Sequence, residues 1–260
     1  MKKIVIAIMA IIIIFCFLAY LGSKKEKPAN SEKTESESLQ KESAPRFYDL
    51  KVGQTITFGY YEQENVFDND GKLLLWEEQT LEPIEWVVLA VEDDKALIIS
   101  KYALDCFHFH DHDGYPVTWE TCYTRKWLNE WFYKRAFECY DHDIIATTTV
   151  IPDENPENTR QGNITQDKVF LLSVSEAEKY FGSDSARKCR GTEFCYARHA
   201  AGDVSENENE KWCVWWLRPS YETTLIPNVK GYNGSIDKRG ISNDCGVYVV
   251  RPAMWIYINY

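Results

Sequence analysis

The stretch WCVWWLRPS, from Trp212 to Ser220, together with GVYVVRPAMWI, from Gly246 to Ile256, decides the fold of this chain. Four tryptophans fall within the 44 residues from the first of these segments to the second, a density typical of a packed core or a binding face. Between the segments, Asn233-Gly234 predicts a hairpin turn, because both residues accept the positive φ that a tight turn needs. From Val247 onward apolar residues fall on both faces of an extended chain, which predicts short strands buried on both sides.

Two arginines stand among these apolar residues. A buried guanidinium is costly unless it is paired, so each is expected to form a salt bridge or to cap backbone carbonyl groups, with a ligand clamp as the alternative. Exposed indoles stack on sugars, and arginine binds carboxylates through two hydrogen bonds. The candidate ligand-binding residues are therefore Trp215, Trp216, Arg218 and Arg251. The alternative interpretation places both tryptophans in the core.

The N-terminus predicts a membrane anchor. After Met1-Lys2-Lys3, the 19 residues from Ile4 to Gly22 carry no charge and are long enough to span a bilayer as a helix. We therefore expect an uncleaved signal anchor over 1–22, with a cleaved signal peptide as the alternative. Residues 23–45 are rich in Lys, Glu and Ser and predict a disordered linker. A single domain over 46–260 would then lie outside the cell, attached to the cell membrane by one span.

Composition excludes one class of partner. The formal net charge is −11, and no basic stripe interleaved with aromatic residues occurs. Because a chain with this negative charge repels phosphate backbones, no nucleic-acid partner is expected. No Gly-rich phosphate loop or other motif that would bind a cofactor is present, and no cofactor is expected.

Local patterns predict both strands and helices. The strands are expected at Gln54–Tyr60 and in a hairpin of Pro83–Val91 with Ala96–Ser100 at the centre of a sheet. One amphipathic helix is expected from an N-cap at Thr124 to Phe137, with its aromatic stripe in the core. A second should begin at the capping box of Ser173 and Glu176 and end at Gly182.

Two groups of residues raise the alternative of an enzyme. His108, His110 and His112 alternate in one segment, but alternation alone does not bring three ligands to one point, so a surface loop is the favoured interpretation and no metal site is predicted. Of the cysteines after the anchor, none forms a CxxC pair, and Cys189 with Cys195 could close a short disulfide. No catalytic residue is predicted.

The order of motifs resembles a bacterial family of exported domains of unknown function. The segments that carry the resemblance are FGYYEQ (Phe58 to Gln63), PIEWVVL (Pro83 to Leu89), ALIISKYALDC (Ala96 to Cys106), TWETCYTRKWLN (Thr118 to Asn129), TQDKVFLLSVSEAEKYF (Thr165 to Phe181), WWLRPS and GVYVVRPAMWI. The family usually has Arg-Ser-Pro where this chain has Arg218-Pro219-Ser220. No catalytic residue comes with this resemblance.

The tryptophan-rich end further resembles the C-type lectin-like fold of formylglycine-generating enzymes. That resemblance implies an α+β domain with a small twisted antiparallel sheet, two helices and long ordered loops. The hypothesis that follows is a membrane-anchored binding module for a glycan, a peptide or another cell-envelope component. The alternative is an enzyme of the formylglycine-generating type, or another metal-dependent or thiol-dependent enzyme, in which Cys213 and Cys245 or the histidines would act.

Overall fold

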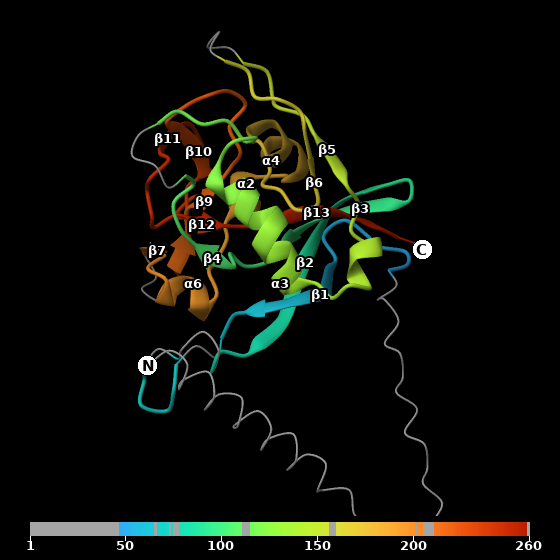
Figure 1. Cartoon of the computed structure of the whole chain (residues 1–260), viewed down its shortest axis with the longest axis vertical. Coiled ribbons are helices and arrows are strands. Elements are labelled where there is room, and N and C mark those ends of the chain that lie inside the picture. Colours follow the sequence, from blue (N-terminus) through green and yellow to red (C-terminus); the bar gives the residue numbers. More distant parts are fainter. Residues whose placement is uncertain are drawn as a thin grey trace, which may run out of the picture. The chain divides into compact units, whose positions relative to one another are not determined.

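The computed structural model describes residues 47–64, 67–72, 74, 78–110, 115–155, 160–200, 202–204 and 211–258, all within one compact unit, Ser43–Tyr260. The expected anchor (1–22) and linker (23–45) lie outside these residues, so both stay predictions. Within the described ranges, no helix is both long and apolar enough to cross a membrane. The described chain is an α+β structure made mostly of strands, with few helices (Figure 1).

A four-stranded antiparallel sheet contains the predicted hairpin. Its strands lie in the order β1 (Thr55–Glu62), β2 (Leu81–Glu92), β3 (Lys95–Ser100) and β13 (Ala253–Tyr257). The predicted strand at Gln54–Tyr60 and the central position of the hairpin are confirmed. At Gly59 the chain makes a β-bulge with a φ of +70°, and a Cβ there would lie 2.5 Å from the Phe137 ring, so only glycine fits without strain.

A second, five-stranded sheet lies beside the first. Its strands lie in the order β11 (Ile236–Ser242), β10 (Leu225–Val229), β9 (Trp215–Trp216), β12 (Val249–Val250) and β4 (Asp105–Cys106). The pairing of β12 with β9 is parallel, whereas the other pairings in this sheet are antiparallel. The hairpin predicted at Asn233-Gly234 is confirmed between β10 and β11, with Gly234 at a φ of +75°.

The described residues also form two shorter ribbons. β5 (Thr148–Val150) pairs with β6 (Thr165–Asp167), and β7 (Gly202–Val204) pairs with β8 (Lys211–Cys213).

The C-terminal stretch joins the two main sheets. It does not form one strand, because β12 ends at Val250 and β13 begins at Ala253. Proline has no N–H to donate to a ladder, and the Pro252 carbonyl instead accepts a hydrogen bond from the Ser100 amide (2.9 Å). β12 pairs in the five-stranded sheet and β13 in the four-stranded sheet, so this stretch connects the two sheets.

The predicted long helix consists of three consecutive helical segments: α2 (Tyr123–Trp127), the π-helical η2 (Leu128–Phe132) and α3 (Tyr133–Ala136). Its N-cap is Cys122, whose Sγ accepts from the Arg125 amide (3.4 Å). The expected cap at Thr124 is wrong, because its hydroxyl donates to the Phe109 carbonyl oxygen (3.0 Å) instead.

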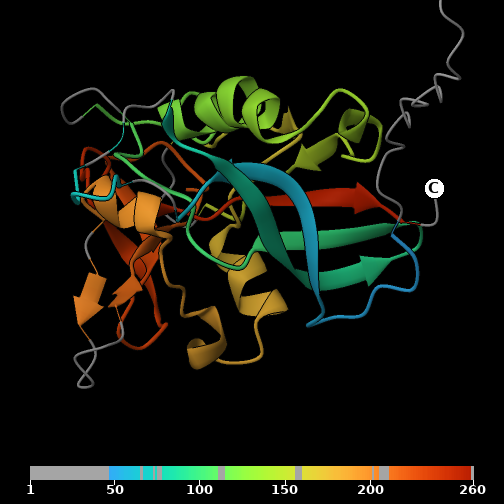
Figure 2. The same ribbon diagram turned by 90° about the horizontal axis from the view of Figure 1, so that it is seen from below.

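The capping box at Ser173 is confirmed at the start of α4 (Val174–Tyr180). The helix ends at Phe181 in an extended conformation, and Gly182 does not adopt the positive φ expected of a C-terminal glycine. Shorter helical turns are α5 (Asp184–Arg187), α6 (Glu193–Ala197) and η3 (Asp141–Asp143). The segment from α2 to α3 lies on one side of the strands and α4 lies on the other (Figure 2).

Candidate functional site

The two indoles predicted to bind a ligand lie in the core. Trp215 and Trp216 form β9, and both are 0% exposed. The Trp215 Nε1 donates to the Arg187 carbonyl oxygen (3.0 Å), and the Trp216 Nε1 donates to that of Phe107 (3.1 Å), so both N–H groups are satisfied within the fold. The structure favours the core interpretation of both tryptophans, and their contact with a ligand stays a prediction.

Arg251 lies at the junction of the two sheets and is 4% exposed. Its Nε donates to the Ser100 carbonyl oxygen (2.9 Å), and its Nη1 donates to that of Arg187 (3.3 Å). The guanidinium also lies 5.1 Å from the centre of the Trp215 ring. Burial lowers the pKa of Arg251. Through these contacts Arg251 caps backbone carbonyl groups, as expected of a buried guanidinium.

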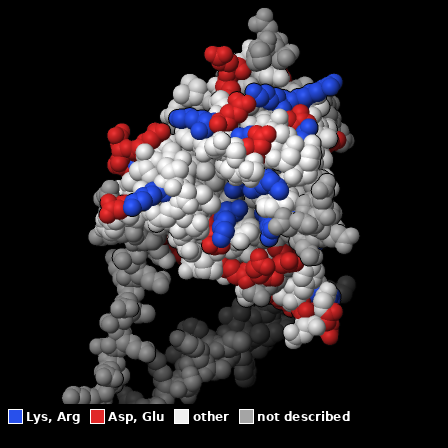
Figure 3. All heavy atoms as spheres, turned by 180° about the vertical axis from the view of Figure 1, so that it is seen from behind, with Lys and Arg blue, Asp and Glu red and all other residues white. Residues whose placement is uncertain are grey.

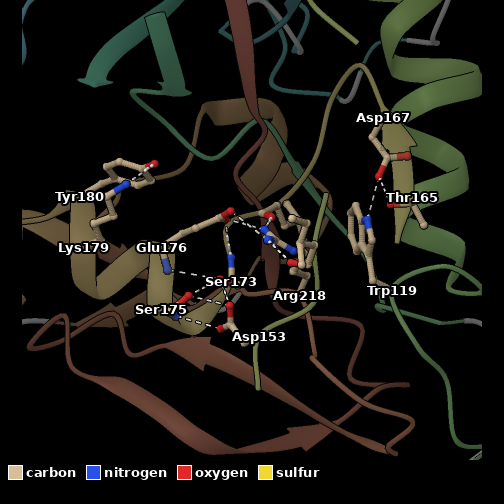
Figure 4. A network of polar contacts seen from close by, with 12 residues as sticks. Trp119, Asp153, Thr165, Asp167, Ser173, Ser175, Glu176, Lys179, Tyr180 and Arg218 are labelled. Carbon is tan, nitrogen blue, oxygen red and sulfur yellow. Dashed lines mark hydrogen bonds and ion pairs between the residues drawn. The ribbon is translucent and has the colours of Figure 1, made fainter. Parts of the chain in front are cut away.

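Arg218 holds α4 against the chain that follows β9 (Figure 4). It is 3% exposed and pairs with both oxygens of Glu176, at 2.5 Å from Nη1 and 2.9 Å from Nη2. Nη1 also donates to the Leu171 carbonyl oxygen (2.8 Å) and Nη2 to that of Ile151 (3.2 Å). Glu176 also accepts from the Ser173 amide (3.0 Å), as the capping box requires. The ion pair and the helix cap therefore share one carboxylate.

Partly exposed aromatic residues lie instead on the helix that begins at Tyr123. Tyr123 is 39% exposed, and Trp127 and Trp131 are half-buried. The two indole rings are stacked, with centroids 5.6 Å apart and planes at 23°. We call these three residues the aromatic ridge. The expectation that the whole stripe lies in the core is therefore correct only for its inner members, such as Phe132.

Trp127 and Trp131 are four residues apart, and side chains at this spacing lie on the same face of a helix. A π-helical turn begins between them, in which the Tyr133 amide donates to the Leu128 carbonyl oxygen, five residues earlier. Single π-helical turns are frequent at functional sites.

Two hollows flank the outer surface of this helix, and both include Tyr123, Lys126 and Glu130. The aromatic hollow, about 360 Å³, is completed by the two indoles. The polar hollow, about 460 Å³, is completed by His110, Glu120, Thr121, Cys122, Arg125, Asn129, Gln166 and Asp167. A ligand that crosses the helix would thus meet aromatic side chains on one side and hydrogen-bonding groups on the other.

Ion pairing fixes the floor of the polar hollow. The Arg125 Nε donates to Asp167 Oδ1 (2.7 Å), and the Arg125 side chain remains partly exposed. Asp167 Oδ2 accepts from Trp119 Nε1 (2.9 Å) and from Thr165 Oγ1 (2.6 Å) (Figure 4). With its carboxylate partner held in this way, Arg125 is presented in a defined orientation.

A buried polar group supports the aromatic ridge from below. The Tyr61 ring lies edge-on to the rings of Trp127 (6.4 Å between centroids) and Trp131 (6.2 Å). Its hydroxyl donates to Asp105 Oδ2 (2.8 Å), whose other oxygen accepts from Arg198 Nε (2.7 Å). Burial raises the pKa of Tyr61 well above its usual range and also raises the pKa of Asp105.

Two of the three alternating histidines fall within the described residues. His110 lines the polar hollow, and its Nδ1 accepts from the Tyr123 amide (3.3 Å). The His108 ring lies 6.2 Å from that of Tyr123, and His112 lies outside the described residues. In the part of the chain that the structure describes, no three His, Cys, Asp or Glu side chains are grouped so that they could hold a metal ion.

The seven cysteines of the described ranges are free thiols, so the disulfide considered between Cys189 and Cys195 is not formed. Cys213 is buried and Cys245 is half-buried. Both thiols lie near Cys106 and help to raise its pKa to about 12, although burial is the largest cause. A thiol with so high a pKa is protonated at neutral pH and is a poor nucleophile.

The comparison with protein families gives one match. The model of the domain of unknown function DUF6273 matches residues 93–258, which include the aromatic ridge, both hollows, Arg218 and Arg251. No curated protein and no solved structure matches the chain. This chain belongs to the DUF6273 family, as the order of its motifs predicts.

Proposed function

We propose that this domain is a binding module that holds a neutral glycan on the aromatic ridge. The observation that carries the proposal is the stacked, half-buried pair of Trp127 and Trp131 beside the exposed Tyr123. Aromatic rings stack on the apolar C–H face of a pyranose, and the polar hollow offers donors and acceptors to its hydroxyl groups. The ridge replaces Trp215 and Trp216 as the stacking surface in this proposal.

Charge supports a neutral glycan over an anionic one. The formal charge of the whole chain is −11 and that of residues 1–42 is +2, which leaves −13 for residues 43–260. Such a domain repels polyanions. Among the residues that line the hollows, Lys126 and Glu130 carry opposite charges, and Arg125 is paired with Asp167. On the face seen from behind in Figure 3, basic and acidic side chains are interspersed, and wide areas carry neither. This face therefore presents no broad basic surface to a polyanion.

The same proposal includes the setting of the domain. The apolar residues 4–22 would anchor the chain in the cell membrane, and the linker would present the domain outside the cell. A C-type lectin-like arrangement is also part of the proposal. It is supported by the small sheets, the two principal helical segments and the long connections between them.

The thiol-dependent enzyme finds less support. Its reaction would need a reactive thiol at Cys213 or Cys245, and Cys213 is 0% exposed. The neighbouring Cys106 is protonated at neutral pH because burial raises its pKa to about 12. The surroundings of Cys106, Cys213 and Cys245 thus favour a packing role for these thiols and not a reactive one.

The test uses the full chain in a mild detergent and isothermal titration calorimetry. The probes are hexamers of β-1,4-linked glucose, β-1,4-linked N-acetylglucosamine and galacturonate. We expect at least one of the two neutral hexamers to bind and the anionic one not to bind. Replacing Tyr123 by Ala should weaken binding about fivefold, because one aromatic stacking contact contributes about 1 kcal/mol.

The matched control is Tyr48→Ala, which removes a tyrosine that is 53% exposed and lines neither hollow. It should leave binding unchanged. The proposal is wrong if neither neutral hexamer binds, or if Tyr123→Ala and Tyr48→Ala affect binding equally.

A further inference from the structure

The polar hollow beside the aromatic ridge presents two polar atoms that the fold leaves without a partner. Its volume, about 460 Å³, lies in the range typical of ligand sites. The two atoms are Arg125 Nη2 and Glu120 Oε1, and both residues line the hollow. Neither atom makes a hydrogen bond or an ion pair among the described residues, and both retain solvent-accessible surface. A ligand in the hollow can therefore reach them.

The rest of each side chain is held by the fold. Arg125 donates through Nε to Asp167 Oδ1 (2.7 Å) and through Nη1 to the Glu120 carbonyl oxygen (3.2 Å). The Asp167 side chain is 0% exposed and also accepts from Trp119 Nε1 (2.9 Å). Glu120 accepts through Oε2 from Asn163 Nδ2 (2.8 Å). The hollow thus offers one donor and one acceptor whose positions are constrained before a ligand arrives.

The opposite charges of these two side chains favour a neutral ligand group. A carboxylate would be attracted by Arg125 but repelled by Glu120, and an ammonium group would meet the reverse. A neutral amide avoids both repulsions, because it presents a carbonyl acceptor and an N–H donor on opposite edges of one plane. Hydrogen bonds from a guanidinium or to a carboxylate are also stronger than those between neutral groups. The hollow is therefore best matched by an amide.

We infer that the polar hollow selects an N-acetylated sugar. The acetamido carbonyl oxygen accepts from Arg125 Nη2, and the acetamido N–H donates to Glu120 Oε1, while a sugar ring stacks on the aromatic ridge. Tyr123, Lys126 and Glu130 line both hollows, so one oligosaccharide can occupy the two at once. The inference rests on the proposed function and adds to it the class of glycan.

The test measures the affinity of the full chain in mild detergent for two hexamers by isothermal titration calorimetry. The hexamers of β-1,4-linked N-acetylglucosamine and β-1,4-linked glucose differ only at C2, which carries an acetamido group in one and a hydroxyl group in the other. We expect the N-acetylglucosamine hexamer to bind about tenfold more tightly, as expected for one additional hydrogen bond to a charged group. Equal affinities, or tighter binding of the glucose hexamer, would overturn the inference and leave the proposed function standing. Binding of neither hexamer would overturn both.

Variants locate the selectivity. In Arg125→Lys the ammonium group can still pair with Asp167 but offers no second terminal nitrogen, so the ratio of the two affinities should fall to about two or less. Arg160→Lys is the matched control, since Arg160 is exposed, pairs with Glu222 and lines neither hollow, and it should leave the ratio unchanged. Glu120→Gln keeps the shape of the side chain and should lower the ratio about threefold, which provides a second test if Arg125→Lys does not fold. A wild-type ratio in either folded variant would show that the inference is wrong.

Discussion

Replacing Glu176 by Gln tests whether Arg218 holds the domain together. The Gln side chain still offers an oxygen to the Ser173 amide, so the helix cap can be kept. The substitution removes the negative charge that faces a guanidinium only 3% exposed. A buried cation is then left without its counter-ion, and the folded state should lose stability.

The size of the stability loss in Glu176→Gln depends on the contacts that Arg218 keeps. Breaking a buried ion pair by removing one partner typically costs about 3 to 5 kcal/mol. Arg218 keeps the carbonyl oxygens of Leu171 (2.8 Å) and Ile151 (3.2 Å), and the Glu176 side chain is 28% exposed, so water can partly replace it. We therefore expect the lower end, about 3 kcal/mol. For a domain of this size that corresponds to a fall in Tm of roughly 6 to 12 °C.

The assay is urea unfolding followed by tryptophan fluorescence, with thermal unfolding as a second measurement. The matched control is Glu178→Gln on the same helix. Its carboxylate pairs with Lys238 at the surface, where the side chains are 47% and 63% exposed, and removing it should cost less than about 1 kcal/mol. Equal losses in the two variants would refute the structural role assigned to the Arg218 pair.

Two further predictions concern the ridge and the bulge. Burial raises the pKa of Asp105, so the folded state binds a proton on this carboxyl group more tightly than the unfolded state does. The wild type should therefore gain stability relative to Asp105→Asn as the pH falls from 7 through the raised pKa. Urea unfolding from pH 7 to pH 4 tests this, and a constant difference between the two proteins would contradict it. Gly59→Ala should destabilise the domain by about 2 kcal/mol, because φ is +70° and the Phe137 ring occupies the space of a Cβ. Gly182→Ala, where no atom lies within 4 Å of a Cβ, is the control and should be nearly neutral in the same assay.

Local signals predict the elements whose structure depends on neighbouring residues. The hairpin of β2 and β3 follows from two apolar runs around a short acidic turn, and the start of α4 follows from Ser173 and Glu176. In both cases the interactions that define the element lie within a few residues. The cap at Cys122 was not predictable in this way, because Thr124 has a competing partner, the Phe109 carbonyl oxygen, fifteen residues away in the sequence.

The division of the C-terminal stretch depends on partners that are distant in sequence. Apolar residues on both faces predict burial from Val247 to Ile256, and Pro252 marks an interruption. Nothing nearby indicates that Val249 pairs with Cys106 while Ala253 pairs with Ile99. The same limit applies to Arg218, because its partner Glu176 lies 42 residues earlier.

Which aromatic residues remain at the surface depends on how many sides of an element are covered. β9 lies between β10 and β12, and its side chains are covered on both faces: Phe181 packs near Trp215 (6.2 Å between centroids), and Phe109 packs near Trp216 (5.8 Å). A helix that packs on a sheet buries only one side, and the aromatic positions beyond that side must face water. Dense aromatic residues in a central strand are therefore poor candidates for binding, whereas a helical stripe wider than its buried side leaves rings available to a ligand.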